Sequence, residues 1–455
     1  MAIQHNTIQS LPDITIKGEF SSPIISASID TRTLSRGELF VAFNGAQVDG
    51  HDFITNAISR GASAIMASTL WDGCETWDAS IPLIMTKDPA KTLADLATAH
   101  RMSFNIPLIA ITGTNGKTTT KNLLSHILSK KFSVLYTKGN FNNHIGLPLT
   151  LLQMNESHDI AVIEMGASQQ GDIEYLCNIA RPTQGLITNV SMAHTEFFHD
   201  LDTIQLTKGE LFQYLSANNG QLFINEDDPR IRALAHSYSD YISFGFHKDT
   251  ESSYSMTGPD QSGCYDLHFH DLDAHLRHPG KALALNAAAA VTIASHNNIE
   301  PALTQEALQD YPGEKGRMQH VILNGVHFYN DAYNANPASA LAGLETMAEM
   351  GESTRKILVF ADMLELGDQS QELHLSMAEH MLKAGFDYII LLGLEVMIIA
   401  KYLEHQEFKS FYHNVEKSAA IQRFLKQVMV GDLVYLKGSR SMQLEDFLTA
   451  YKESN

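Results

Sequence analysis

The chain has 455 residues and a formal net charge of −20, from 32 Lys and Arg against 52 Asp and Glu. This charge excludes a basic nucleic-acid-binding protein as a first interpretation. Hydrophobic residues make up 44% of the chain and charged residues 18%, a balance that excludes a largely disordered protein. At roughly 150 residues per domain, the length predicts about three domains.

The first 87 residues predict a small α/β domain, with the boundary near residue 88. The stretch from 52 to 60 is typical of a helix, and Asp88 is a good N-cap for a helix that opens with Pro89. Short apolar strands are predicted at 24–32, 38–45, 61–68 and 81–86.

Residues 88–315 predict a central domain. Its predicted strands are apolar on both faces and alternate with helices. This pattern indicates a buried, mostly parallel sheet of the phosphate-loop type. The strands are expected at 106–112, 133–137, 159–165, 185–190 and 221–225, and the helices at 118–130 and 203–216. Residues 252–278 predict antiparallel hairpins, and the alanine-rich stretch 281–295 predicts a helix.

Residues 316–455 predict a third, Rossmann-like α/β domain. Helices are expected from Pro337 and near Gln371. Strands are expected at 321–325, 326–331, 356–360, 388–393 and 433–438. No internal repeat is evident.

The spacing of the cysteines and the length of the apolar runs indicate the cellular compartment of the protein. Cys74, Cys177 and Cys264 form no Cys-x-x-Cys pair, so neither a disulfide framework nor a zinc knuckle is predicted. No apolar run approaches the ~20 residues that a bilayer span needs, and the first residues do not resemble a signal peptide. We therefore expect a cytoplasmic protein without membrane insertion.

The segment from 109 to 120 is an apolar strand that runs through a glycine-containing turn into a helix. Gly113 and Gly116 let main-chain N–H groups converge, Lys117 can reach a terminal phosphate, and Thr118 can bind Mg²⁺. Ile111 stands where the strict phosphate-loop pattern has its first glycine, so the loop is a shortened variant. The alternative is a plain strand-to-helix turn with a surface lysine.

Polar residues follow two later strands. Glu164 ends an apolar run, at the strand edge where α/β sheets bind ligands, and its carboxylate suits Mg²⁺. His194 lies just past the next strand, and Lys208 lies in the following helix. A solvated turn carboxylate, a packed histidine and a solvated lysine are the respective alternatives.

A set of motifs in fixed order resembles the Mur ligases over nearly the whole chain. The set comprises SIDTR at 28–32, GAQVDGHDF at 45–53, GTNGKTTT at 113–120, TKGNFNNHIGLPLTLL at 137–152, EMGA at 164–167, NVSMAH at 189–194, TKGELF at 207–212, GRMQ at 316–319, DAYNANPAS at 331–339, ADMLELGDQSQELH at 361–374 and LKGSRSMQLE at 436–445.

The resemblance implies an ATP-dependent acid–amino-acid ligase with one domain each for a UDP-sugar, ATP and the incoming amine. Within the family, Asn336-Pro337 is followed by Ala338 rather than Arg, and KGSR replaces KGHE. These differences favour joining D-alanyl-D-alanine to UDP-N-acetylmuramoyl-tripeptide for peptidoglycan synthesis. The alternatives are a family member that adds the third residue (diaminopimelate or lysine), folylpolyglutamate synthase, and a phosphate-loop ATPase switch that ligates nothing.

The resemblance also implies individual roles. Lys117, His194 and Lys208 are the expected catalytic residues, and a metal is expected on Thr118, Glu164, His194 and Lys208. Residues expected to bind ATP are Gly113, Thr114, Asn115, Gly116, Lys117, Thr118, Thr119, Asn286, Arg317 and Asp331. Residues expected to bind the two substrates are Ser28, Asp30, Arg32, Gly45, Asp49, His51, Asn140, Asn142, Asn143, Asn334, Asn336, Lys437, Ser439 and Arg440.

Several of these roles have ordinary structural alternatives. Asn286 could be a helix-surface amide, the asparagine cluster at 140–143 a turn, and His374 an ordinary helix-face histidine. Lys208 matches a lysine that many Mur ligases carbamylate, which would turn a cation into an oxygen ligand for one or two Mg²⁺. We expect a monomer.

Overall fold

The computed structural model describes residues 3–45, 48–78, 80–192, 200–246, 250–270, 272–350 and 354–454. The chain divides into two compact units. The first contains Met1–Thr112, Lys131–Leu186 and Thr207–Leu222, and the second contains Gly113–Lys130, Ile187–Leu206 and Phe223–Asn455. The boundaries proposed from the sequence, at residues 87/88 and 315/316, stay predictions.

The first unit opens with a five-stranded sheet in the order β1-β5-β4-β3-β2. Its strands are β1 (Ile14–Lys17), β2 (Ala27–Ser28), β3 (Leu39–Val41), β4 (Ala64–Ser68) and β5 (Leu83–Thr86), and its helices are α1 (His5–Gln9), η1 (Gly50–Phe53), α2 (Ile54–Ser59) and η2 (Asp72–Cys74). Only β1 runs antiparallel to its neighbour. The α/β prediction is confirmed, but the strand predicted at 24–32 shrinks to two residues, and β1, a half-exposed strand, was not predicted.

Helix α3 (Pro89–Met102) follows this sheet and packs against α5 (Gly146–Leu151) and α6 (Asp172–Ala180). Asp88 caps it as predicted, because its carboxylate accepts the N–H groups of Ala90 and Lys91 at 3.0 Å each.

The other part of the first unit contains strands in the order β10-β9-β6-β8-β7, which belong to a nine-stranded sheet. They are β6 (Leu108–Thr112), β7 (Val134–Tyr136), β8 (Ile160–Glu164), β9 (Gln184–Ile187) and β10 (Gln221–Asn225), and α7 spans Leu201–Ala217. β8 pairs in parallel with both β6 and β7. All residues of β6, β8 and β9 are buried, as expected for a parallel sheet covered on both faces.

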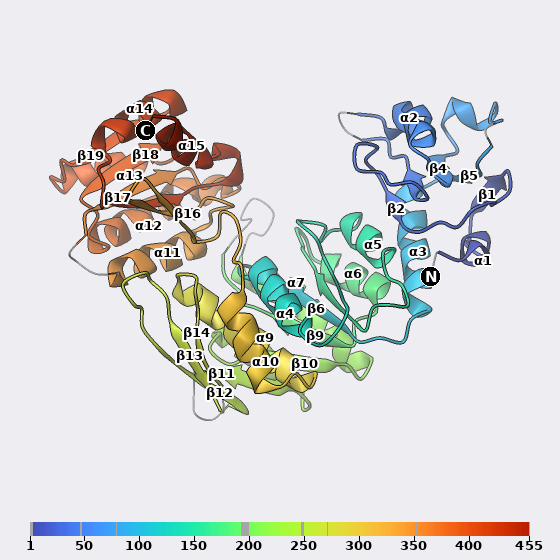
Figure 1. Ribbon diagram of the computed structural model, residues 1–455, viewed down its shortest axis with the longest axis horizontal. Coiled ribbons are helices and arrows are strands. Elements are labelled where there is room, and N and C mark those ends of the chain that lie inside the picture. The colour runs from blue at the N-terminus through green and yellow to red at the C-terminus, as the bar shows by residue number, and fades with distance from the viewer. Residues whose placement is uncertain are drawn as a thin grey trace. The chain divides into compact units, whose positions relative to one another are not determined.

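The second unit contains β11 (Ile242–Gly245), β12 (Ser252–Thr257), β13 (Asp266–Phe269) and β14 (Leu272–His275), which are neighbours in the order β14-β13-β12-β11. The predicted hairpins are confirmed, since β12, β13 and β14 pair antiparallel. The helices are α4 (Lys117–Leu128), α8 (Pro229–Ala235), α9 (Lys281–His296) and α10 (Pro301–Asp310). Helix α4 lies along α9, with α10 beside it (Figure 1).

A six-stranded sheet completes the second unit, in the order β15-β16-β20-β17-β18-β19. Its strands are β15 (Gln319–Leu323), β16 (Val326–Asp331), β17 (Lys356–Ala361), β18 (Tyr388–Leu392), β19 (Phe411–Asn414) and β20 (Leu433–Lys437). Only β15 runs antiparallel to its neighbour. The chain passes from β16 to β17 and leaves a place between them for β20, so the strand order changes direction there. In α/β sheets ligands bind at such a point, and we expect them at the carboxyl ends of β16, β20 and β17.

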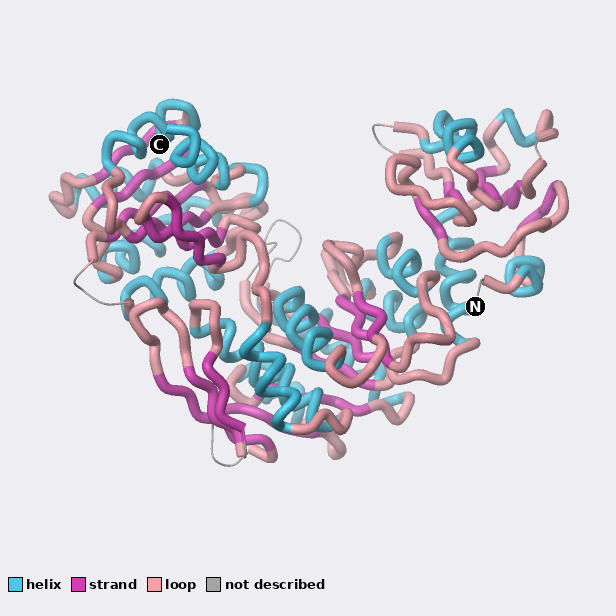
Figure 2. The backbone as a smooth tube through the Cα atoms, in the orientation of Figure 1, coloured by secondary structure: helices cyan, strands magenta, loops and turns pink. Residues whose placement is uncertain are grey.

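Helices cover both faces of this sheet (Figure 2). Residues of α11 (Pro337–Glu349), α12 (Ser370–Lys383) and α13 (Met397–His405) share one core. Residues of α14 (Lys417–Gln427) and α15 (Glu445–Ser454) share the other, and η3 (Gly367–Gln369) and η4 (Arg440–Met442) are short 3₁₀ turns. The Rossmann-like prediction for this part is confirmed. Across the described residues, every helix is too short or too polar to span a bilayer.

We expect Asp88→Ala to lower the free energy of unfolding by about 1 kcal/mol, because two N–H groups at the start of α3 lose their acceptor. The change should appear as a lower urea midpoint of the transition that melts the first unit. Asp95→Ala is the control, since Asp95 pairs with the exposed Lys91 on the same helix and such pairs contribute about 0–1 kcal/mol. Equal midpoints for the two variants would contradict the capping role.

Candidate active site

The glycine turn after β6 prepares an anion site at the start of α4. Gly116 precedes the helix with φ 79°, and Gly113 has φ 138°, both in the region that favours glycine. The N-cap residue of α4 is Gly116, which has no side chain that could cap the helix. The start of the helix therefore suits an anion, since its first N–H groups and the helix dipole both favour a negative ligand.

Lys117 adds a cation to this turn. Its ammonium donates to the carbonyl oxygens of Gly113 and Thr114, at 2.8 Å each. The lysine side chain is thus folded over the loop whose N–H groups would hold a phosphate. Thr118 and Thr119 follow in the first turn of α4, both half-buried.

The segment after β9 holds the loop from one side. The N–H groups of Thr114 and Asn115 donate to the carbonyl and side-chain oxygens of Asn189, at 3.0 Å each. The Asn189 amide and the Thr188 hydroxyl both donate to the Asn115 carbonyl, at 2.9 and 2.6 Å. Asn189 and Thr188 were missed as positioning residues, although NVSMAH was among the motifs.

Asn286 lies on α9 directly beside the loop. A methyl group added to Gly116 would come within 2.4 Å of its amide oxygen. The structure therefore places this amide next to the phosphate turn, and its predicted contact with adenine stays a prediction.

Arg317 brings a second cation to the same place. Its guanidinium donates to the Thr118 hydroxyl at 3.3 Å and pairs with Glu314 at 3.2 Å. It also lies over the ring of Tyr333, 4.3 Å from the centroid. Tyr333 and Glu314 were not predicted. They orient the arginine toward the start of α4.

Asp331 and Lys437 form an ion pair at the carboxyl ends of β16 and β20. The Lys437 ammonium donates to Asp331 at 2.7 Å, and its side chain is only 2% exposed. Asp331 also accepts from the Tyr435 hydroxyl at 3.2 Å and from the Met318 N–H at 3.1 Å. The pairing fixes the carboxylate that the family resemblance assigns to the ribose, while Lys437 has almost no exposed surface to offer a substrate.

The asparagines of the DAYNANPAS motif are partly used inside the protein. Asn336 exchanges side-chain amide hydrogen bonds with Asn115, at 2.7 and 3.3 Å, and caps α11 by accepting from the Ser339 N–H at 2.9 Å. The Asn334 carbonyl accepts from Lys437 at 3.1 Å. Asn336 thus links the phosphate loop to the start of α11.

The end of β20 presents one buried and one exposed residue. Ser439 is buried, and its hydroxyl accepts the Leu364 N–H at 2.8 Å. Arg440 is exposed and pairs with Glu445. His374 is fully buried on α12, where its Nε2 accepts the Met363 N–H and its Nδ1 donates to the Ser370 carbonyl. Burial lowers the pKa of His374.

In the first unit, Glu164 is buried at the end of β8, and its carboxylate accepts from the Asn142 amide at 2.8 Å. The Asn143 side chain accepts the N–H of Gly146, the first residue of α5, at 2.9 Å, and Asn140 is exposed. Lys208 is 4% exposed on α7, so the solvated-lysine alternative is wrong. His194 lies outside the described residues.

The five-stranded sheet carries the predicted UDP-sugar residues on two turns. Asp30 forms a salt bridge with the exposed Arg32 at 2.7 Å, and this arginine lowers the pKa of Asp30. The Ser28 hydroxyl accepts the Asp30 N–H at 3.2 Å. This turn leaves a guanidinium in solvent, where a diphosphate can reach it.

The second turn is closed by internal hydrogen bonds. Asp49 accepts from the N–H and Nδ1 of the buried His51, whose Nε2 accepts the Ser68 N–H at 3.1 Å. The His51 bonds lower the pKa of Asp49. Gly45 leaves no room for a side chain, since a Cβ would lie 2.8 Å from the Val48 carbonyl. These residues shape the turn, and their substrate contacts stay predictions.

Three family models match the chain. They are the Mur ligase family catalytic domain at residues 24–101, the Mur ligase middle domain at 111–294 and the Mur ligase glutamate ligase domain at 316–440.

Individual relatives match at full length. An Escherichia coli protein named UDP-N-acetylmuramoyl-tripeptide–D-alanyl-D-alanine ligase is 30% identical over 98% of both chains. The crystal structure of MurF from Acinetobacter baumannii superposes with a TM-score of 0.83 at 26% identity, covering 95% of this chain and 94% of that one. MurF ligase from Thermotoga maritima, solved in complex with ADP, gives 0.80 at 28% identity, covering 94% and 97%.

Replacing Gly116 by Ala should weaken binding of a non-hydrolysable ATP analogue by about tenfold or more, because the new methyl group meets Asn286 and the backbone stays left-handed. Isothermal titration calorimetry measures this. Gly171→Ala is the control, since Gly171 also has a positive φ, 90°, but an added Cβ there meets nothing within 4 Å. Unchanged affinity in Gly116→Ala would remove the loop from the nucleotide site.

Proposed function

The chain belongs to the Mur ligase family, and on this premise we propose that it joins D-alanyl-D-alanine to the C-terminal carboxylate of UDP-N-acetylmuramoyl-tripeptide, with ATP as the energy source. The observation that carries the proposal is the uncapped start of α4, with Lys117 and Arg317 beside it. The name of the Escherichia coli relative and the ADP bound to the Thermotoga maritima relative support the dipeptide substrate and ATP.

The reaction has two steps. A carboxylate is a poor electrophile, so the γ-phosphoryl group of ATP first passes to the tripeptide carboxylate, giving an acyl phosphate and ADP. The free amine of the dipeptide then attacks the acyl carbon, a C–N bond forms, the C–O bond to phosphate breaks, and the amine gives up a proton. Such transfers are catalysed mainly by positioning and by neutralising charge.

The nucleotide is held by elements of the second unit. The N–H groups at the start of α4 would bind its phosphates, and Lys117 would leave the carbonyls of Gly113 and Thr114 for a phosphate oxygen. Arg317, kept in place by Tyr333, would neutralise the transferred group. Asn286 would contact the adenine and Asp331 the ribose.

The family implies Mg²⁺, and the side chains fit a hard cation. Glu164 is a buried carboxylate that Asn142 orients, and Thr118 offers a hydroxyl. We assign these two, with His194, to one or two Mg²⁺ that would screen the phosphate charge. Lys208 would join them as a carbamate, because an ammonium would repel the metal.

The two substrates would meet exposed polar groups. Arg32, which is 87% exposed, suits the UDP diphosphate, with Ser28, Asp30, Gly45, Asp49 and His51 shaping its site. Asn140, Asn142 and Asn143 would contact the muramyl sugar. Arg440, which is 61% exposed, suits the carboxylate of the dipeptide, with Asn334, Asn336, Lys437 and Ser439 forming the surrounding edge.

The setting follows from the substrates. ATP and UDP-sugars are cytoplasmic metabolites, and the three cysteines are free and buried, as suits a reducing compartment. We place the enzyme in the cytoplasm as a monomer that binds neither nucleic acid nor membrane.

Phosphate release should require both UDP-N-acetylmuramoyl-tripeptide and D-alanyl-D-alanine, with diaminopimelate and lysine inactive as replacements for the dipeptide. Lys117→Ala should lower turnover by about 10²–10³-fold, because a cation at the transferred group is lost. Lys91→Ala, which changes an exposed lysine on α3, serves as control. Phosphate release with ATP alone would indicate an ATPase switch. Phosphate release with diaminopimelate and the UDP-N-acetylmuramoyl acceptor that carries a dipeptide would indicate addition of the third residue.

Lys208→Ala should abolish turnover, whereas Lys208→Glu should retain part of it, because a carboxylate can replace the oxygen ligands of a carbamate. Isotope-labelled bicarbonate should give a carbamate signal in the wild-type protein by nuclear magnetic resonance, and Lys208→Ala should lose it. Full turnover in the alanine variant, or no carbamate signal in the wild type, would count against the modification.

A further inference from the structure

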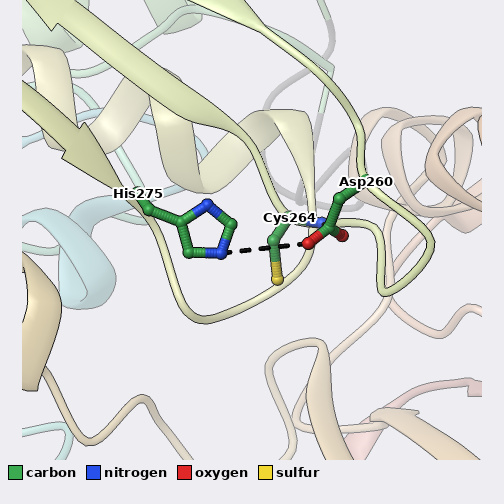
Figure 3. A group of neighbouring side chains, drawn as sticks. All are labelled: Asp260, Cys264 and His275. Carbon is green, nitrogen blue, oxygen red and sulfur yellow. Dashed lines mark hydrogen bonds and ion pairs between the residues drawn. The ribbon is translucent and has the colours of Figure 1, made fainter.

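Three side chains of different chemistry meet beside the hairpin formed by β12, β13 and β14. One ligand atom each from Asp260, Cys264 and His275 lies within 4.8 Å of the others (Figure 3). Asp260 and Cys264 belong to the turn between β12 and β13, and His275 ends β14. The proposed ligase reaction uses none of them.

The carboxylate of Asp260 is held so that one oxygen is aimed at the histidine. Its Oδ1 accepts the N–H groups of Ser262 and Cys264, at 2.8 and 2.9 Å. Its Oδ2 lies 3.8 Å from Nε2 of His275. Two main-chain bonds therefore fix the direction of the second oxygen.

The imidazole of His275 is oriented by another carboxylate. Its Nδ1 lies 2.9 Å from Oδ1 of Asp266, which favours a proton on Nδ1 and leaves the Nε2 lone pair facing Asp260. Histidines that bind metals in proteins are commonly held by a carboxylate in this way, because the second hydrogen bond sets both tautomer and ring orientation.

Cys264 supplies the buried third member. The residue is 5% exposed, and its sulfur lies between the imidazole and the carboxylate in Figure 3. Burial, helped by the charges of Asp260 and Asp266, raises the pKa of this thiol to about 12. The carboxylates of Asp260 and Asp266, which face His275, would attract a cation to this group.

We infer that Asp260, Cys264 and His275 form a binding site for a borderline-soft divalent cation such as Zn²⁺, with water as the fourth ligand. Nitrogen, thiolate and carboxylate are the ligands that Zn²⁺ takes in proteins, at about 2.0–2.3 Å and in tetrahedral geometry. Tetrahedral ligands at those lengths lie about 3.3–3.8 Å from one another. Small side-chain rotations from the present spacing suffice.

The turn that carries two of these ligands also contacts the C-terminal sheet and its helices. The Ser262 carbonyl accepts from the Tyr329 hydroxyl of β16 at 3.3 Å, and the Tyr265 hydroxyl donates to Glu349 of α11. A cation that ties this turn to β14 would make both contacts more rigid. A bound cation would therefore stabilise the hairpin against α11 and β16.

The test uses the full chain, treated with chelator and then titrated with Co²⁺ in the absence of nucleotide. Co²⁺ replaces Zn²⁺ and reports a thiolate ligand by a sulfur-to-cobalt absorption band. We expect one thiolate-bound Co²⁺ per chain, displaced by Zn²⁺, and a higher melting temperature with Zn²⁺. Cys264→Ser and His275→Gln should lose the band, and Asp266→Asn should weaken binding by about 10–100-fold.

Two variants serve as matched controls. His268→Gln changes a histidine on the same hairpin that bonds Asp273 at 2.7 Å, and Cys177→Ser changes another buried thiol. Both should keep the band, while circular dichroism shows that each variant is folded. Absence of a thiolate band in the wild type, or its persistence in Cys264→Ser, would overturn the site.

Discussion

Helix α4 begins after a glycine, which has no side chain to cap the first main-chain N–H groups, and the rest of the second unit's site is arranged around this helix start. Two glycines with positive φ shape the turn, Asn189 holds it, and Lys117 and Arg317 add positive charge. On a protein with a net charge of −20, a triphosphate can bind only where local positive groups outweigh the overall field. The uncapped helix supplies that place because its partial charge is fixed by the backbone.

The Asp331–Lys437 ion pair fixes the position of two charged side chains at the edge of the C-terminal sheet. A buried ion pair contributes little net stability, since desolvation offsets the attraction, but removing one partner leaves an isolated charge. The pair therefore keeps both side chains in one position whether or not a ligand is present. Tyr435 and Met318 complete the hydrogen bonds of the carboxylate, so a ribose would meet a preset acceptor.

A structural feature could be predicted from the sequence when the residues that determine it are close together along the chain. The strand, glycine turn and helix at 109–120 are local, so the order of residues there was enough to predict a phosphate loop, and the Asp88 cap is equally local. Asn286 and Arg317 reach the loop only through the fold, so their roles came from family resemblance. Hydrogen bonds between distant segments leave no periodic pattern, which explains why Asn189 and Tyr333 were missed and why the burial of His374 was not foreseen. The strands β1 and β2 are too short for a period to show.

Exposure separates the cations that can meet a substrate from those that act at a distance. The Lys437 side chain is 2% exposed and forms an ion pair with Asp331. It could therefore influence a bound dipeptide only through its electrostatic field, which the paired carboxylate largely cancels. Arg440, on the same segment, is 61% exposed, and its ion-pair partner Glu445 is itself partly in solvent. A pair of that kind is weak enough for a ligand carboxylate to replace Glu445, and the guanidinium can bind the carboxylate through two parallel hydrogen bonds. Under the proposed function, the exposed arginine rather than the buried lysine would bind the dipeptide's carboxylate, and the lysine would shape the edge beside it.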